Sequence, residues 1–361
     1  MKNSILAYVI LSCGSLFAAA PNADSLPPRP EILALMHRVH AYQIAHPITK
    51  PGTRSWMRDT WYTGVMEAWE ATRDETFLND ALNWGKQDNW QVGPQALGAN
   101  RLFCCMTWLQ LYLIKHDPAM IEPTIRWLDT PATNSPAGAK RWYLDKGKPY
   151  VDALYCAEVF PMLTQITGKR EYLTIMRSFF DDISGANWDE ESGLYYRDPT
   201  FIGKRTAHGK KVFWSRGNGW IFAGIARMLE YLPKDDPERQ KYIAIYRRMA
   251  AELIKRQSPD GFWRANLDDP EDTPNPESSG TGFFCFGLAW GINQGILDRP
   301  TFLPPTKKAY AALVSAVSPE GKVQWGQKID EKPNEAQRES THEYVTGIFL
   351  LASGEVYKLS R

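Results

Sequence analysis

The sequence FWSRGNGWIFAGIARMLEY at residues 213–231 carries the pattern that decides the fold of this chain. Its first part places Trp214 and Trp220 around Arg216 and two glycines, and its second part is apolar at helical spacing. Glycine allows a close backbone approach, arginine offers a planar fork of donors to carboxylates, and indole faces suit sugar rings. The stretch is therefore either a tight turn with two core tryptophans and a surface arginine, or a binding wall that opens a helix.

Helical spacing of apolar residues recurs along most of the chain. It predicts helices over residues 31–46, 56–72, 75–90, 100–116, 118–128, 151–167, 171–184, 217–231, 237–257, 280–297, 301–316 and 341–359. Strand signals are few and short, and residues 193–197 look extended. The sequence therefore predicts an all-α protein.

These segments form six consecutive pairs, whose starts follow one another at intervals of about fifty residues. Six helical hairpins can close into a ring, which buries the inner faces of the second helices. We therefore predict an (α/α)6 six-hairpin toroid, with an open helical array as the alternative. No shift in composition marks a boundary, so residues 21–361 are expected to form a single catalytic domain.

Residues 1–20 have the organisation of a signal peptide. A short basic start precedes an apolar run, and three alanines at positions 18–20 resemble a signal-peptidase site. The apolar run is too short for a membrane span. Pro21 and Cys13 leave the cleavage site and lipidation open. We expect an exported protein, periplasmic or secreted, with no stable membrane insertion after cleavage.

Composition narrows the class of partner. The formal net charge is +1 and both signs are interspersed, which argues against nucleic acid or an anionic membrane surface. The chain holds 14 tryptophans, which are common in carbohydrate-binding clefts and also in cores. Four cysteines follow the leader within apolar runs, which indicates core residues and neither a disulfide framework nor a metal site.

The starts of the second helices share a composition. Polar, glycine or tryptophan residues gather at residues 56–61, 99–101, 150–152, 214–220, 278–282 and 340–343, and apolar residues follow each group. In a closed toroid these six starts meet at one end of the barrel. Helix N-termini favour anions, so this end would suit a sugar that bears a carboxylate.

Asp152 is the best candidate for a general acid or base in this ring. Its neighbours are apolar, and desolvation raises the pKa of a carboxyl group. On spacing alone, capping of its own helix is the favoured interpretation. Asp59 and Glu343 are further candidate carboxylates. His208 and Lys210, in the loop before Trp214, could reach an anionic substrate, although a solvated loop face is the simpler interpretation.

The segment Trp214-Ser215-Arg216-Gly217-Asn218-Gly219-Trp220 resembles the signature of glycoside hydrolase family 105, the unsaturated rhamnogalacturonyl or glycuronyl hydrolases, related to family 88. Asp152-Ala153-Leu154-Tyr155 is similar to the segment that holds the catalytic aspartate of that family. Residues 107–112, 277–284 and 347–357 also resemble the family, so the resemblance covers nearly all of the chain after the leader.

The resemblance implies a six-hairpin toroid that removes a 4,5-unsaturated uronic acid from the non-reducing end of small, lyase-generated oligosaccharides. The aspartate is thought to protonate C4 of the enol ether, water adds at C5, and the hemiketal opens to release the aglycone. No metal or organic cofactor is needed. By this resemblance Asp152 is the proton donor and water activator. Arg216 is a candidate for the uronate, and Trp61, Trp214 and Trp220 for ring contacts.

One departure from the family pattern concerns Asn100 and Arg101. The family usually carries an aspartate pair here, just after an alanine, and this chain reads Ala99-Asn100-Arg101. Asn100 can bond a substrate hydroxyl but cannot share a proton with Asp152, and the cation of Arg101 would lower the pKa of Asp152.

This departure leaves several alternatives open. The activity could be reduced, or the substrate could differ from the family norm. A toroidal glycosidase on saturated sugars would need two carboxylates, for which Asp59 or Glu343 is the candidate partner. A glycan-binding protein without catalysis is the third possibility. The sequence does not identify the polysaccharide, because aglycone contacts are expected in loops such as residues 130–148.

Overall fold

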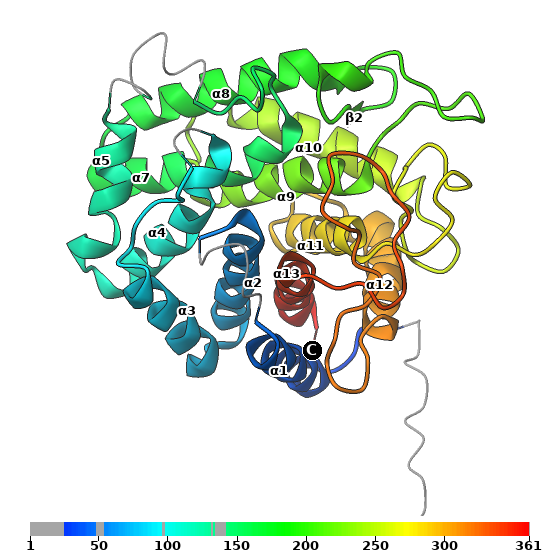
Figure 1. Cartoon of the computed structure of the whole chain (residues 1–361), viewed down its shortest axis with the longest axis horizontal. Coiled ribbons are helices and arrows are strands. Elements are labelled where there is room, and N and C mark those ends of the chain that lie inside the picture. The colour runs from blue at the N-terminus through cyan, green and yellow to red at the C-terminus, as the bar shows by residue number, and fades with distance from the viewer. Residues whose placement is uncertain (1–24, 48–53, 96–97, 131–132, 134–141, 361) are drawn as a thin grey trace, which may run out of the picture.

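The computed structural model describes residues 25–47, 54–95, 98–130, 133 and 142–360. Within these residues the helices form two concentric rings around one axis (Figure 1). The predicted all-α (α/α)6 toroid is therefore confirmed. The predicted signal peptide at residues 1–20 lies outside the described residues.

The inner ring consists of the second helix of each predicted pair. Its members are α2 (Trp56–Thr72), α4 (Phe103–Lys115), η3 (Val151–Glu158) continued by α7 (Val159–Thr167), α9 (Ser215–Tyr231), α11 (Ser278–Asn293) and α13 (Glu343–Leu359). Each inner element contacts the next, and α13 packs against α2 to close the ring. The prediction of a closed array, as opposed to an open one, is confirmed.

The outer ring contains the first helix of each pair. Its members are α1 (Arg29–Ala45), α3 (Glu75–Gln87), α5 (Glu122–Leu128), α8 (Glu171–Asn187), α10 (Arg239–Ile254) and α12 (Arg299–Ser315). Short 3-10 turns, η1 (Ala99–Leu102), η2 (Pro118–Met120) and η4 (Pro199–Phe201), lie in the connections. The strands β1 (Trp188–Asp189) and β2 (Leu194–Tyr195) form a small antiparallel hairpin, so the extended segment predicted at residues 193–197 is partly a strand.

The inner helices are buried along most of their length. In α9 every residue from Ser215 to Leu229 is buried, including the polar residues Arg216, Asn218 and Arg227. At the closing seam a Cβ on Gly64 of α2 would lie 2.0 Å from the carbonyl oxygen of Gly347 in α13. Only glycine permits this approach of two backbones.

The helix predicted at residues 151–167 begins differently from the others. Its first half, η3, is a 3-10 helix, and 3-10 segments of this length are uncommon outside strained or functional positions. The next inner helix packs directly on its backbone, because a Cβ on Gly224 of α9 would lie 2.6 Å from the carbonyl oxygen of Leu154. The segment that bears Asp152 is therefore held tightly against α9.

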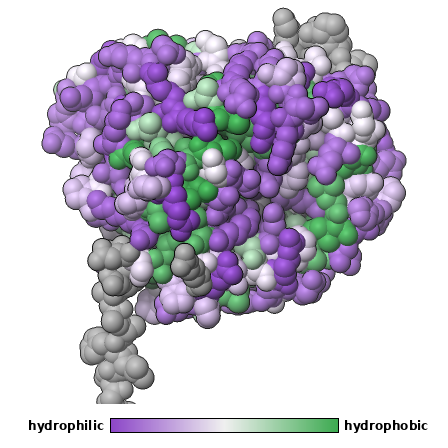
Figure 2. All heavy atoms as spheres, turned by 180° about the vertical axis from the view of Figure 1, so that it is seen from behind, coloured by the Kyte–Doolittle hydropathy of each residue, from purple (hydrophilic) through white to green (hydrophobic). Residues whose placement is uncertain are grey.

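The cysteines and the lengths of the helices agree with the sequence. Cys104, Cys105, Cys156 and Cys285 are free and buried, which confirms their prediction as core residues. Among the described residues, no helix combines the length and the apolar character needed to cross a membrane. Figure 2 shows the face opposite to that of Figure 1, on which polar side chains surround separate apolar patches.

Candidate active site

The starts of four inner elements surround a pocket of about 550 Å³. Trp56 of α2, Asn100 of η1, Asp152 of η3 and Arg216 of α9 all line it. The starts of α11 and α13 do not. Residues 329–331, from the loop between α12 and α13, line the pocket instead. Four of the six starts thus line the pocket, and the starts of α11 and α13 contact that of α9 through Glu277 and Tyr344.

Three aromatic side chains from different inner helices form an apolar wall of this pocket. The ring centroids of Trp56 and Trp220 are 5.9 Å apart, and Phe103 lies 5.9 Å from Trp220. Flat aromatic faces of this kind suit the apolar face of a sugar ring. Trp220 is therefore where the sequence predicted it. The sequence marked Trp56 only as part of a helix start and did not predict its place in the pocket.

Asp152 lies in the pocket with one carboxylate oxygen bound and one without a partner. Its Oδ2 accepts a hydrogen bond from Arg197 Nε at 3.2 Å, and Oδ1 has no hydrogen-bond partner in the described part of the chain. Burial raises the pKa of Asp152, although the cations of Arg197 and Arg216 oppose the shift, and the charge of Glu331 adds to it. A carboxyl group in this state suits general acid and base chemistry.

The structure decides against the capping interpretation of Asp152. The N-cap of η3 is Tyr150, and no side chain caps this end of the helix. Asp152 stands two positions later, and its carboxylate turns to Arg197.

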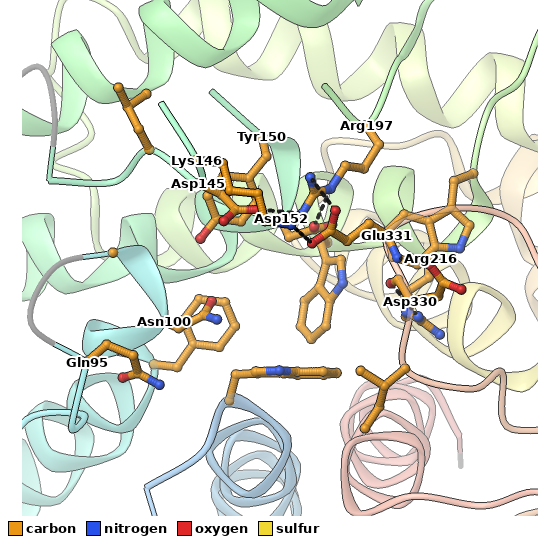
Figure 3. Close-up of a pocket in the computed structure, with 17 residues that line it drawn as sticks. Gln95, Asn100, Asp145, Lys146, Tyr150, Asp152, Arg197, Arg216, Asp330 and Glu331 are labelled. Atoms are coloured by element: carbon orange, nitrogen blue, oxygen red, sulfur yellow. Dashed lines mark hydrogen bonds and ion pairs between the residues drawn. The ribbon is translucent and has the colours of Figure 1, made fainter. Parts of the chain in front are cut away.

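Arg197 is the centre of the charged half of the pocket. Its side chain is 8% exposed, and its guanidinium lies 4.9 Å above the ring of Tyr150. Besides Asp152, it contacts three carboxylates: Asp198 at 3.0 Å, Asp145 at 3.6 Å and Glu331 at 3.7 Å. Burial alone would lower the pKa of Arg197, but the surrounding carboxylates raise it, so the group stays charged. Figure 3 shows Arg197 with Asp145, Asp152 and Glu331.

Sequence reasoning missed Arg197 as a site residue. It predicted only an extended segment that ends at this position. The available signal was a lone arginine at the end of that segment, and nothing in its spacing connects it with Asp152.

The backbone around Arg197 is tied to both η3 and α9. Val151 N–H donates to the carbonyl oxygen of Arg197 at 3.0 Å. Tyr195 stands two residues before Arg197 and is held by the side chain of Asn218 in α9. Asn218 accepts a hydrogen bond from Tyr195 N–H at 2.9 Å and donates one to the carbonyl oxygen of Tyr195 at 3.0 Å. The asparagine of the signature segment therefore fixes the strand that delivers Arg197 to Asp152.

Arg216 lines the pocket, but most of its donors are already occupied. Nη1 donates to Tyr344 Oη at 2.8 Å and to Gln327 O at 3.3 Å, and Nη2 donates to the carbonyl oxygens of Lys328 and Asp330 at 3.1 and 3.2 Å. These bonds use four of the five N–H groups of a guanidinium. Arg216 thus holds the loop between α12 and α13. Its predicted contact with a uronate stays a prediction.

Trp214 has a similar place in the structure. Its indole packs against the Arg216 guanidinium at 4.4 Å, and its Nε1 donates to Gln327 Oε1 at 2.8 Å. It also lines the pocket, so a contact with a sugar ring stays a prediction. Asn100 lies across the pocket from Arg216 and Asp330 (Figure 3), and its contact with a substrate hydroxyl group stays a prediction.

Three residues predicted to bind substrate do not line the pocket. Trp61 is buried in the core and stacks on His40 at 5.5 Å, because it stands five positions after Trp56 and so lies on another face of the helix. Arg101 lies away from the pocket. Its guanidinium carbon is 5.3 Å from the centre of the Trp127 ring, and its Nη1 donates a hydrogen bond to the carbonyl oxygen of Gln95.

His208 is the third of these residues. Its Nδ1 contacts Asp269 at 2.9 Å, and 48% of its side chain is exposed. The solvated loop face was therefore the correct interpretation for His208. The substrate contacts predicted for Trp61, Arg101 and His208 are corrected by these positions.

The carboxylates proposed as alternatives also lie elsewhere. Glu343 is paired with Arg58 at 2.8 Å, and Asp59 is fully buried. Neither lines the pocket. The carboxylates that share the pocket with Asp152 are Asp145, Asp330 and Glu331. They were missed because all three stand in loops, where spacing carries no information about position.

This chain resembles known proteins in sequence and in structure. The model of the family described as Glycosyl Hydrolase Family 88 matches residues 34–360. The chain belongs to glycosyl hydrolase family 88. This confirms the resemblance predicted from the signature segments, and the protein is a glycoside hydrolase of this family.

Three similar proteins illustrate the relationship. An "Unsaturated 3S-rhamnoglycuronyl hydrolase" of Formosa agariphila is 32% identical over 99% of this chain and 100% of its own length. The structure of a family 88 glycosyl hydrolase from Bacteroides vulgatus is 30% identical, with a TM-score of 0.84 over 92% of this chain and 99% of that one. A structure described as a polysaccharide lyase is also 30% identical, with a TM-score of 0.83 over 92% of this chain and 98% of that one.

Proposed function

We propose that this protein removes a 4,5-unsaturated uronic acid from the non-reducing end of lyase-generated oligosaccharides, with Asp152 as acid and base. The observation that carries the proposal is Asp152 itself. It is a largely buried carboxyl group with a raised pKa, it lines a pocket of about 550 Å³, and its Oδ1 has no hydrogen-bond partner among the described residues. The name of the relative from Formosa agariphila supports the unsaturated uronyl group as the part that is released.

The reaction needs one group that gives and then takes a proton. Protonated Asp152 gives its proton to C4, the C4–C5 double bond is consumed, and a water oxygen bonds to C5. The ionised carboxylate takes the proton that this water loses, which restores Asp152. The resulting hemiketal opens to a ketone at C5, the C1 carbon becomes an aldehyde, and the neighbouring sugar leaves with a hydroxyl group.

The surroundings of Asp152 suit such a substrate. The starts of the inner helices favour a carboxylate, and Trp56, Phe103 and Trp220 offer aromatic faces to a sugar ring. Leu144, Asp145 and Lys146 line the mouth, which supports the expectation that the loop of residues 130–148 contacts the aglycone. Rhamnose is the neighbouring sugar that we propose first, because of the relative named a rhamnoglycuronyl hydrolase.

The test follows the ultraviolet absorbance of the enol ether in digests of several uronate polysaccharides. The wild-type protein should remove this absorbance from at least one digest. Asp152→Asn should reduce the rate by a factor of about 1,000 or more, because the essential proton donor is lost. Asp235→Asn, an exposed carboxylate between α9 and α10, is the matched control. Equal rates for wild type and Asp152→Asn would exclude the assignment of Asp152.

A second candidate function is elimination, since one similar structure is described as a polysaccharide lyase. A lyase creates the enol ether that the proposed hydrolase destroys, so one measurement separates the two functions. With an intact uronate polysaccharide, a rise of absorbance indicates a lyase. With a lyase digest, a fall indicates the hydrolase. Sugar binding without either change would indicate a glycan-binding protein.

We also propose that the protein is exported, on the evidence of the apolar segment and three alanines within residues 1–20. Fractionation of producing cells, with sequencing of the mature N-terminus, tests this proposal. Full-length protein in the cytoplasmic fraction would contradict it.

A further inference from the structure

The pocket contains three carboxylates besides Asp152, although the sequence has none where the family resemblance expects an aspartate pair. Asn100 and Arg101 occupy the positions of the aspartate pair, and Arg101 is turned away from the pocket. Glu331 instead enters the pocket from the loop between α12 and α13. In Figure 3, Glu331 and Asp152 both lie beside the Arg197 guanidinium.

Contacts on both sides fix the position of Glu331. Its Oε2 lies 3.7 Å from Arg197 Nη1, and its Oε1 accepts from Lys146 Nζ at 3.2 Å. The loop that carries it is anchored at residues 327, 328 and 330 by Arg216, and again at Gln327 by Trp214. The signature segment therefore brings Glu331 to this place through the backbone of its loop.

Glu331 and Asp152 lie beside the same guanidinium. Nε of Arg197 contacts Asp152, Nη1 contacts Asp198 and Glu331, and Nη2 faces Asp145. Coulomb interactions add pair by pair, so the attraction of Arg197 for Asp152 is opposed by the repulsion from the neighbouring carboxylates. The charge of Glu331 therefore offsets part of the effect of Arg197 on Asp152.

We propose that Glu331 is the second carboxylate of this active site, a positioning residue that acts through Arg197 to keep Asp152 protonated and able to donate. The inference rests on the proposed function for its reaction, but its electrostatic part does not require turnover. It assigns to a loop residue the charge that the family places on an inner helix.

The groups that face Asp152 come from several segments, and their effects have definite signs. Burial and the charge of Glu331 raise the pKa of Asp152, and the two cations lower it. The charged or titratable groups around it are Arg197, Arg216, Glu331, Asp145 and Tyr150. When the Glu331 charge is removed, its repulsion of the Asp152 carboxylate disappears. Asp152 then ionises at lower pH.

A purely structural role for Glu331 makes a different prediction. Its bond to Lys146 joins the turn at residues 145–148 to the loop at residues 327–331 beside the pocket mouth. If this bond only shaped the mouth, its loss would change KM and leave the pH dependence of kcat as it was. The Lys146→Gln variant removes the bond and keeps the Glu331 carboxylate, so it separates the two roles.

The experiment compares pH profiles of kcat for wild type, Glu331→Gln, Glu331→Asp and Lys146→Gln on a lyase-generated disaccharide. In Glu331→Gln the alkaline limb should move to lower pH by about half a unit, a modest shift because 51% of the Glu331 side chain is exposed. Glu331→Asp keeps the carboxylate, so its alkaline limb should lie close to that of wild type. Glu335→Gln, an exposed glutamate of the same loop, is the control and should match wild type. If the alkaline limbs of Glu331→Gln and Glu335→Gln coincide, the proposal is overturned.

A second readout does not depend on activity. With aspartate labelled at its carboxyl carbon with carbon-13, the Asp152 resonance is the one missing from Asp152→Asn. Its titration midpoint should be lower in Glu331→Gln than in wild type. An unmoved midpoint refutes the role of Glu331 whether or not turnover is seen. Absence of turnover by wild type on every digest refutes only the proposed function, and the two failures are therefore distinguishable.

Discussion

Asn218 holds Tyr195 at both its amide and its carbonyl group, two residues before the arginine that contacts Asp152. The same signature segment reaches the other side of the pocket, where Arg216 binds the carbonyl oxygens of residues 327, 328 and 330. The signature therefore acts on Asp152 from a distance. It positions two segments that bring Arg197 and Glu331 to the same carboxylate.

Replacement of Arg197 should have an effect opposite in sign to that of Glu331→Gln. Without the guanidinium, Asp152 loses its nearest cation, its pKa rises, and the alkaline limb of kcat moves to higher pH. The buried carboxylates left behind should also cost about 3–5 kcal/mol of unfolding free energy. Arg197→Gln tests this by pH profiles and urea unfolding. Arg126→Lys, in an exposed ion pair on α5, should change neither quantity.

Asn218→Ala should impair catalysis through the backbone of β2. It leaves the amide and carbonyl of Tyr195 without partners in a buried place, which should cost about 1–3 kcal/mol of unfolding free energy. Because Arg197 follows two residues later, kcat should fall as well. Denaturant unfolding and kcat are compared with Asn79→Ala on the exposed face of α3. A loss of stability with unchanged kcat would show that Arg197 does not depend on this clamp.

Arg216→Lys separates a loop-holding role from direct substrate binding. A lysine ammonium cannot bond three carbonyl groups and Tyr344 from the place of the fork, so the loop at residues 327–331 should loosen. Trypsin should then cleave faster after Lys328. If cleavage is unchanged while KM rises, Arg216 is instead the uronate ligand predicted from the sequence.

Alanine at two inner-ring glycines should have different consequences. Gly224→Ala pushes on the carbonyl of Leu154 in η3, whereas Gly64→Ala pushes on Gly347 at the ring seam. Overpacking should cost each about 1–3 kcal/mol of unfolding free energy. Only Gly224→Ala should also lower kcat, because η3 carries Asp152. Gly185→Ala on α8, where an added Cβ meets nothing within 4 Å, is the control for both.

A buried glutamate at the other end of the barrel should make stability depend on pH. Burial raises the pKa of Glu67 from 4.5 to about 7, although Lys358, 2.8 Å away, opposes the shift. The folded state therefore binds this proton more tightly than the unfolded state. The stabilisation is fully present below pH 4.5 and is lost as the pH rises to about 7. Urea unfolding of Glu67→Gln should lack this decrease, and Glu75→Gln on the exposed start of α3 should keep it. Parallel curves for wild type and Glu67→Gln would contradict the prediction.

The fold was accessible from the sequence because its information is local. Apolar residues at helical spacing mark each helix, and the predicted range of α2, residues 56–72, matches the observed helix. The signature at residues 214–220 also indicated the family. The 3-10 form of η3 was not visible, because residues 151–158 have an ordinary helical pattern.

The sequence by itself determined the ring of helix pairs, the family and the place of Asp152 at the start of an inner helix. These depend on periodicity and short motifs. Only the tertiary structure decided which charged groups surround Asp152. Arg197 and Glu331 arrive from loops 45 and 179 residues farther along the chain, and loop spacing does not encode where a side chain ends. The structure also shows that Arg216 anchors the loop between α12 and α13, because its guanidinium meets backbone carbonyl groups that carry no mark in the sequence.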